Sequence, residues 1–202
     1  MNTLKRVIDI SYNKKLTHLS SVLTSLPVIE KIYEIKKDKD IFVLGNSHAA
    51  LALWVVLESK GLCNAEEMVD KYGTHAFRDI EHGIYVSGGS LGQAETIAVG
   101  MALADRSKTV YLMTSDGACA EGSIWETLRI AHDLNLNNLK VVVIANGQGA
   151  TGEIDVDYLE NRLRAFFPVV VIKSNLGGFP ESLKGIKGHY NCLSLEDYVK
   201  FQ

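Results

Sequence analysis

The chain has 202 residues, of which 47% are hydrophobic and 22% are charged, and its formal net charge is -3. This composition is typical of a folded globular protein, and the scattered basic residues predict no nucleic-acid-binding surface. No apolar run approaches the roughly 18 to 20 residues that cross a bilayer, and the start lacks a signal-peptide pattern, so we expect a cytoplasmic protein with no membrane partner.

The first predicted elements alternate between a strand and helices. A short apolar run predicts a strand at residues 41–44, and the segment 48–60, which is apolar nearly all round, predicts a buried helix. Asn64 followed by Glu67 resembles the capped start of a short helix. Residues 73–90 contain many turn formers and no sustained period, so we expect a long loop, and such loops in compact domains are often functional.

The next elements form a predicted βαβ unit. After a helix over residues 91–104, rich in small residues, come a strand at 109–114, a helix at 122–135 and a strand at 139–146. Alternating strands and helices are typical of a mostly parallel sheet flanked by helices. The sequence therefore predicts an α/β fold, and the absence of a linker or repeat indicates one domain over residues 1–202.

Polar side chains follow both strands of this βαβ unit. Asp116 and Gly117 follow the first strand, and Asn146 follows the second. Because parallel strands end at the same edge of a sheet, we expect Asp116 and Asn146 to become neighbours. Taken singly, Asp-Gly and Asn-Gly are more often ordinary turns. Together, a carboxylate and an amide oxygen at the ligand-binding edge of an α/β sheet suit magnesium with a diphosphate.

Several motifs together resemble the transketolase family. The stretch "SDGACAEGSIWETLRIAHDLNLNNLKVVVIANGQGATG" is similar to its thiamine diphosphate motif. Similar segments extend over nearly the whole chain: "THLSSVLTSLPVIEKIY", "FVLGNSHAALALWVVLESKG", "VSGGSLGQAETIAVGMALA" and "VVVIKSNLGGFPESLKGIKGHY". The resemblance implies the diphosphate-binding (PP) fold, in the N-terminal subunit of a transketolase that is split into two chains.

The resemblance also implies a cofactor site. Magnesium would be held by Asp116, by the side chain of Asn146 and by the main-chain carbonyl of Gln148. The diphosphate of thiamine diphosphate would contact Gly117 and His48. The thiamine would lie along the main chain of Gly89 and Leu91.

The same resemblance supplies catalytic candidates. Histidines that contact the hydroxyl groups of the sugar substrate are matched by His18, His75 and His189, and His189 is also expected to contact the cofactor. Glu121 matches a glutamate in a proton network between subunits. Departures from the family pattern are Ser115, the pair Ser20 and Ser21, the pair Ala94 and Glu95, and a shortened region before residues 169–174. The shortening predicts a trimmed sheet edge or altered substrate access.

The implied function is that of one chain of a transferase. Together with a separate pyrimidine-binding subunit, in a heterotetramer by analogy, it would transfer a two-carbon ketol unit between phosphorylated or nucleotide-activated sugars. The alternatives are one chain of a thiamine-dependent decarboxylase or acyl-condensing enzyme, and a non-catalytic regulatory paralogue. We expect Asp116→Ala to abolish metal-dependent cofactor binding by the complex and to leave the isolated fold nearly intact.

Overall fold

The computed structural model describes residues 1–149, 152–174 and 178–201. The chain divides into two compact units, each assembled from segments that are distant in sequence. Unit 1 comprises residues 1–34, 47–76 and 175–202, and unit 2 comprises residues 35–46 and 77–174. A single domain over the whole chain therefore stays a prediction.

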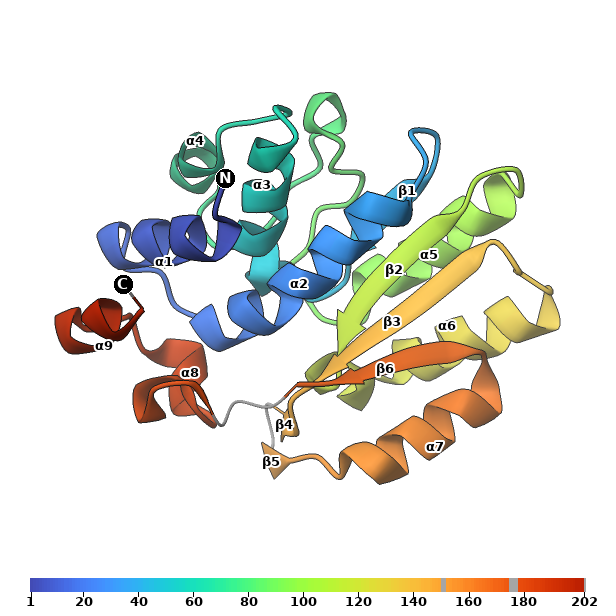
Figure 1. Cartoon of the computed structure of the whole chain (residues 1–202). Coiled ribbons are helices and arrows are strands. Elements are labelled where there is room, and N and C mark those ends of the chain that lie inside the picture. The colour runs from blue at the N-terminus through green and yellow to red at the C-terminus, as the bar shows by residue number, and fades with distance from the viewer. Residues whose placement is uncertain (150–151, 175–177, 202) are drawn as a thin grey trace. The chain divides into compact units, whose positions relative to one another are not determined.

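Unit 2 contains a four-stranded sheet in the order β1-β2-β3-β6 (Figure 1). The strands are β1 (Ile41–Leu44), β2 (Val110–Ser115), β3 (Leu139–Ala145) and β6 (Val169–Lys173). Each neighbouring pair is parallel, which confirms the predicted fold class. A two-stranded antiparallel hairpin follows β3 and consists of β4 (Gln148–Gly149) and β5 (Gly152–Glu153).

Three helices of unit 2 lie on one face of this sheet (Figure 1). They are α5 (Gln93–Ala104), α6 (Gly122–Asp133) and α7 (Val156–Phe166). In α6, the residues that the helical period places on one face, Ile124, Leu128 and Ala131, are all buried. They belong to one hydrophobic core with residues of β2 and β3, and burying each large side chain contributes roughly 1.5 to 3 kcal/mol before entropy is counted.

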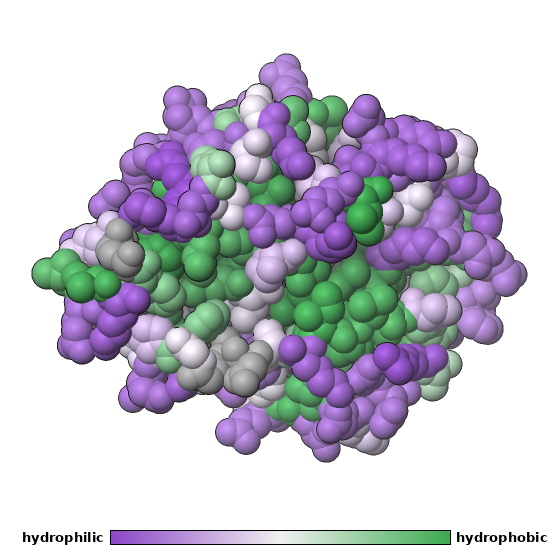
Figure 2. Space-filling model, viewed as in Figure 1, coloured by the Kyte–Doolittle hydropathy of each residue, from purple (hydrophilic) through white to green (hydrophobic). Residues whose placement is uncertain are grey.

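The last strand, β6, forms one edge of the sheet. Its Val170 is 57% exposed, and Ile172 and the neighbouring Val142 of β3 are half-buried. Figure 2 shows an apolar area on the part of the surface where β3 and β6 lie. The described residues of β3 and β6 therefore present accessible apolar side chains on one face of the sheet, and the trimmed edge that the shortened sequence predicts stays a prediction.

Unit 1 is built from helices. They are α1 (Thr3–Asn13), α2 (Leu19–Ile35, whose last residue lies in unit 2), α3 (Ala50–Ser59), α4 (Ala65–Tyr72), α8 (Lys187–Tyr190) and α9 (Leu195–Lys200). The predicted all-round burial of α3 is confirmed, because residues 50–57 are all buried. The predicted cap of α4 is confirmed as well, since Oδ1 of Asn64 accepts hydrogen bonds from the amides of Glu66 and Glu67.

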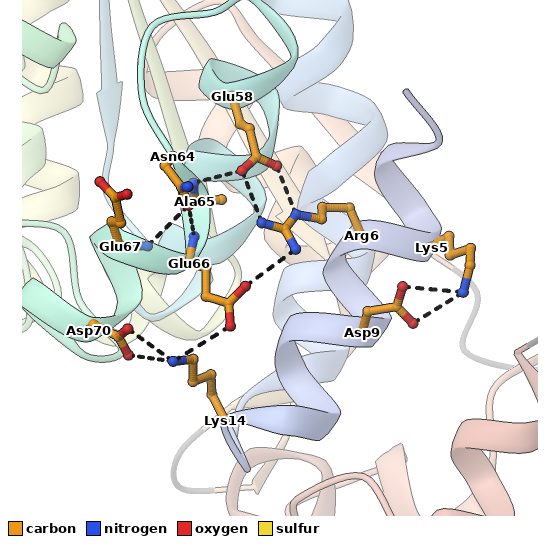
Figure 3. Close-up of polar contacts among 10 residues, drawn as sticks. All are labelled: Lys5, Arg6, Asp9, Lys14, Glu58, Asn64, Ala65, Glu66, Glu67 and Asp70. Atoms are coloured by element: carbon orange, nitrogen blue, oxygen red, sulfur yellow. Dashed lines mark hydrogen bonds and ion pairs between the residues drawn. The ribbon is translucent and has the colours of Figure 1, made fainter.

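A network of ion pairs joins three helices of unit 1 (Figure 3). Arg6 of α1 donates two hydrogen bonds to Glu58 of α3, at 2.9 and 3.1 Å, and one to Glu66 of α4 at 3.4 Å. Lys14, the residue that caps the C-terminus of α1, donates to Asp70 of α4 at 2.7 Å. The hydrogen bond from Arg6 lowers the pKa of Glu58. These contacts are structural, because they position α1 against α3 and α4.

Predicted and observed boundaries differ mainly at turns. The predicted helix over residues 48–60 begins with the short 3-10 turn η1 (Ser47–Ala49), and α3 follows it. The predicted loop 73–90 contains the 3-10 turn η2 (Ile80–His82) and an antiparallel bridge between Asp79 and Ile84. Within the described part of the chain, no helix is long and apolar enough to cross a membrane.

Candidate functional site

Asp116 follows β2 directly and is 3% exposed. One oxygen of its carboxylate accepts a hydrogen bond from the amide of Gly117 at 2.9 Å. The other oxygen accepts from the amides of Asn146 and Gly147, at 2.8 and 2.7 Å. A single carboxylate thus joins the residues that follow β2 to the residues that follow β3, as the parallel topology predicts.

Asn146 begins the turn that leads from β3 into the β4–β5 hairpin. Its Oδ1 accepts a hydrogen bond from the amide of Gln148 at 2.9 Å. Gly147 has a φ of 79°, a left-handed conformation that glycine adopts without strain. The side-chain amide and the glycine therefore shape a turn that keeps the backbone of Gln148 near Asp116.

The environment of Asp116 fits a cation. Burial raises the pKa of its carboxyl group, while the amides of Gly147, Gly117 and Asn146 oppose this shift. Among the described residues, no lysine, arginine or histidine forms an ion pair with Asp116. A buried carboxylate without a basic partner is costly, and a bound cation would offset that cost.

The donor types also suit magnesium, which takes carboxylate, amide and main-chain oxygens. The described residues contain no cluster of three or more histidine, cysteine, aspartate or glutamate side chains that could hold a metal ion. The predicted set does not depend on such a cluster, because Asp116 supplies its one carboxylate and Asn146 and Gln148 supply the other oxygens. These residues fit the ion by the chemistry of their donors.

The helix predicted from residue 122 is observed, and a short turn separates it from Asp116. This turn is η3 (Gly117–Ala120), and α6 begins at Gly122. A Cβ atom added at Gly117 would lie 3.6 Å from the carbonyl oxygen of Gln148, which is an ordinary contact. Protein packing therefore does not require glycine at this position, and its contact with a diphosphate stays a prediction.

The loop before α5 lies against the start of α6. Gly89 is exposed and Leu91 is half-buried. Gly92 has a φ of 81°, and a Cβ atom there would lie 2.2 Å from Oγ of Ser123. Glycine is therefore required at position 92, both for its conformation and for this close approach. Glu121, the residue before α6, is exposed and contacts the same glycine.

Glu95, which departs from the family pattern, points into the core of unit 2. It is 1% exposed, and its Oε1 accepts a hydrogen bond of 2.5 Å from Oγ1 of Thr114. A Cβ atom at Gly45 would lie 2.4 Å from the same Oε1, so Gly45 leaves the space that Glu95 occupies. Oε2 makes no hydrogen bond within the described part of the chain, and burial raises the pKa of Glu95. The acid is therefore a core residue.

Three of the predicted histidines gather in unit 1. The ring centroids of His18 and His48 are 5.1 Å apart, those of His18 and His189 are 5.3 Å apart, and those of His48 and His189 are 5.9 Å apart. His75 is half-buried in the same unit and close enough to lower the pKa of His18 and of His48. The structure thus brings together histidines that are distant in sequence.

Two rings of this cluster, those of His18 and His48, are held in the neutral state. Burial, and then the charges of neighbouring histidines, lower the pKa of His18 to about 4 and that of His48 to about 3. A neutral imidazole carries one N–H donor and one acceptor nitrogen. At neutral pH the cluster therefore offers hydrogen bonds and no positive charge from these two rings.

Backbone contacts position the cluster. His18 has a φ of 62°, an uncommon conformation for a residue with a side chain, and its amide donates to the carbonyl of His189 at 3.2 Å. A Cβ atom at Gly188 would lie 2.3 Å from the carbonyl oxygen of Leu183. Glycine at 188 therefore permits the tight turn that places His189 beside His18.

Two hydroxyl groups at the cluster were not assigned a role from sequence. Oγ1 of Thr17 lies 2.8 Å from Nδ1 of His18, and Oγ of Ser21 lies 3.2 Å from Nε2 of His48. The contact between Thr17 and His18 could have been found from sequence, because the two residues are adjacent. The contact between Ser21 and His48 could not, because it depends on how α2 and η1 pack.

The comparisons with known proteins identify the family. The family model "Transketolase, thiamine diphosphate binding domain" matches residues 28–171. One of the subunits of the apulose-4-phosphate transketolase of Phocaeicola vulgatus is 29% identical over 188 residues, which cover 80% of this chain and 66% of that protein. The 6-deoxy-6-sulfo-D-fructose transketolase subunit SqwG of Clostridium sp. (strain MSTE9) is 34% identical over 143 residues, covering 64% of this chain and 52% of that protein.

Solved structures support the fold. A transketolase from Pichia stipitis matches with a TM-score of 0.70 and 18% identity, covering 100% of this chain and 40% of that one. A transketolase from Leishmania mexicana matches with a TM-score of 0.63 and 18% identity, covering 86% of this chain and 37% of that one. The chain thus spans less than half the length of these two enzymes and at most about two thirds of the two subunits.

Glu95→Gln is expected to stabilise the isolated chain at pH 7 by roughly 1 to 2 kcal/mol, because glutamine fills the same space without a buried charge. The folded-state pKa of Glu95 lies above its unfolded value, so wild-type stability falls as pH rises from the unfolded pKa through the folded pKa. The gain in Glu95→Gln should therefore vanish at pH values below the unfolded pKa. Urea unfolding of both proteins across this range measures it.

A matched control for this measurement is Glu153→Gln, since Glu153 is an exposed glutamate of the same unit. Its substitution should leave the free energy of unfolding nearly unchanged at every pH. A loss of stability in Glu95→Gln at pH 7, with Glu153→Gln unchanged, would show that Glu95 is not a destabilising buried acid.

Asp116→Ala should destabilise the isolated chain by about 3 kcal/mol, because it leaves three backbone amides without their acceptor. These hydrogen bonds argue against the expectation that this substitution spares the fold. Asp116→Asn keeps one oxygen for the amides of Asn146 and Gly147 and should cost less. Urea unfolding without metal measures both variants, and equal stability of Asp116→Ala and wild type would exclude this structural role.

Proposed function

Because the chain belongs to the family of transketolase thiamine diphosphate binding domains, we propose that it is the diphosphate-binding subunit of a two-chain transketolase-like enzyme. The proposed enzyme transfers a two-carbon ketol unit between sugars, and it is active only with a separate pyrimidine-binding subunit. The relatives from Phocaeicola vulgatus and Clostridium sp. are each named as one subunit of their transketolase, which supports a division of the enzyme into two chains.

The main observation that supports this proposal is the buried carboxylate of Asp116. It lies where two parallel strands end, which is the ligand-binding edge of an α/β sheet, and no basic side chain within the described residues neutralises it. Asp116, Asn146 Oδ1 and the carbonyl of Gln148 would hold Mg²⁺, and the ion would bind the diphosphate. Bound thiamine diphosphate supplies the nucleophilic carbon and the electron sink of the reaction.

Each remaining candidate has a proposed role of its own. The backbone at Gly117 and the ring of His48 contact the diphosphate, and the main chain of Gly89 and Leu91 lines the thiamine. Glu121, which is exposed at the start of α6, is available to a neighbouring subunit.

The histidines act on the sugar. His18, His75 and His189 donate and accept hydrogen bonds with its hydroxyl groups, and His189 also contacts the cofactor. Since the pKa of His18 is lowered to about 4, its ring orients a hydroxyl group as a neutral partner rather than as a cation. A sugar phosphate or another anionic sugar would therefore need a different group for its charge.

Exposed apolar surface supports a partner chain. Val170 of β6, together with half-buried Val142 and Ile172, leaves apolar side chains accessible at the edge of the sheet. Exposed apolar patches on folded proteins commonly mark contacts with other proteins. We propose a heterotetramer of two pairs of subunits in the cytoplasm, where the sugar substrate would be found.

The function is tested by mixing the purified chain with its candidate partner chain, Mg²⁺ and thiamine diphosphate. A ketose labelled with ¹³C at C1 and C2 serves as the donor and an unlabelled aldose as the acceptor. We expect the acceptor to gain the labelled two-carbon unit only when both chains are present, as measured by mass spectrometry. Each chain alone is the control.

Other products would contradict the proposal in distinct ways. Release of CO₂ from a 2-keto acid, without transfer from the ketose, would identify a decarboxylase or acyl-condensing enzyme. Failure of the assembled chains to bind Mg²⁺ and the cofactor would identify a regulatory paralogue.

A further inference from the structure

Ser21 lies in the first turn of α2, is 7% exposed, and places its hydroxyl group beside His48. The distance from Oγ of Ser21 to Nε2 of His48 is 3.2 Å, and both residues belong to unit 1. Ser21 is one of the residues at which the sequence departs from the pattern of the family that it resembles. Because the hydroxyl group contacts a histidine that is a candidate ligand of the cofactor, it can affect the hydrogen bonding of that ring.

The hydroxyl group of Ser21 has one acceptor among the described protein atoms. Within the part of the chain that the structure describes, Nε2 of His48 is the one hydrogen-bond partner of the Ser21 hydroxyl. If Nε2 carried the ring proton, the buried hydroxyl hydrogen of Ser21 would have no protein acceptor, at a cost of up to about 1 to 3 kcal/mol. A hydroxyl hydrogen directed to an unprotonated Nε2 avoids this cost.

We propose that Ser21 is a positioning residue that holds His48 in the tautomer with its proton on Nδ1. A neutral imidazole has a single N–H, so an acceptor role for Nε2 leaves the donor on Nδ1. Within the described residues, Nδ1 of His48 makes no hydrogen bond to the protein. The tautomer therefore supplies an N–H that is available to a phosphoryl oxygen. This consequence rests on the proposed function, whereas the tautomer itself does not.

The pair of Thr17 and His18 provides an internal comparison. Oγ1 of Thr17 contacts Nδ1 of His18 at 2.8 Å, which is the other ring nitrogen. The rings of His18 and His48 are 5.1 Å apart, so a general disturbance of the cluster should alter both, whereas loss of the Ser21 hydroxyl should alter His48 alone.

The tautomer is measured by two-bond ¹H–¹⁵N correlation spectra of the imidazole rings in the full chain, labelled with ¹⁵N-histidine, at pH 7 and without cofactor. Signals are assigned with single histidine-to-glutamine variants. We expect His48 to show a protonated Nδ1 and an unprotonated Nε2 in the wild type. A protonated Nε2 in the wild type would overturn the proposal without any variant of Ser21.

Ser21→Ala should shift His48 toward the other tautomer and leave the His18 signals in place, while Ser21→Thr, which keeps the hydroxyl group, should preserve the wild-type pattern. Ser20→Ala is the matched control, because Ser20 is also buried and, among the described residues, makes no hydrogen bond to a histidine ring. An unchanged His48 tautomer in folded Ser21→Ala would also overturn the proposal.

Cofactor binding by the assembled enzyme separates the two proposals. Ser21→Ala should weaken binding of thiamine diphosphate by roughly two- to tenfold, which is the worth of one hydrogen bond, and Ser20→Ala should not. If His48 has the predicted tautomer but the assembly does not bind cofactor, the proposed function is wrong and the role of Ser21 stands. If His48 has the opposite tautomer and the assembly binds cofactor, only the proposed role of Ser21 is wrong.

Discussion

The Asp116 carboxylate is the interaction on which the rest of the unit 2 site depends. It accepts three backbone amide hydrogen bonds from the residues that follow β2 and β3, and so it sets the path of both turns. These amides compensate only part of the cost of burying its charge. The same group is therefore both a structural link and a strong attractor for a cation, which explains why the two roles must be separated by experiment.

The histidine cluster of unit 1 follows a different principle. Burial and the mutual influence of the rings keep His18 and His48 neutral, so their chemistry is decided by which nitrogen carries the proton. Hydroxyl groups of Thr17 and Ser21 contact opposite nitrogens of these two rings. The serine at position 21 thus adds a hydrogen-bonding group beside a candidate ligand of the cofactor.

Local pattern predicted much of the fold and the pairing of Asp116 with Asn146. The apolar runs of β1, β2 and β3, the cap at Asn64 and the parallel topology were all readable, because they depend on neighbouring residues and on general rules of strand connection. The burial of Glu95 was not readable, since its space is left by Gly45, which is distant in sequence. The two compact units likewise have no local signal in the sequence, because each combines distant segments.

The most direct test of the cation site is a crystal structure of the assembled enzyme with thiamine diphosphate and Mn²⁺ in place of Mg²⁺, with the ion located by anomalous scattering. We predict one ion coordinated by the Asp116 carboxylate, by Oδ1 of Asn146 and by the main-chain carbonyl of Gln148, with diphosphate oxygens completing the shell. An ion bound elsewhere, with the cofactor in place and Asp116 contacting only backbone amides, would contradict this prediction.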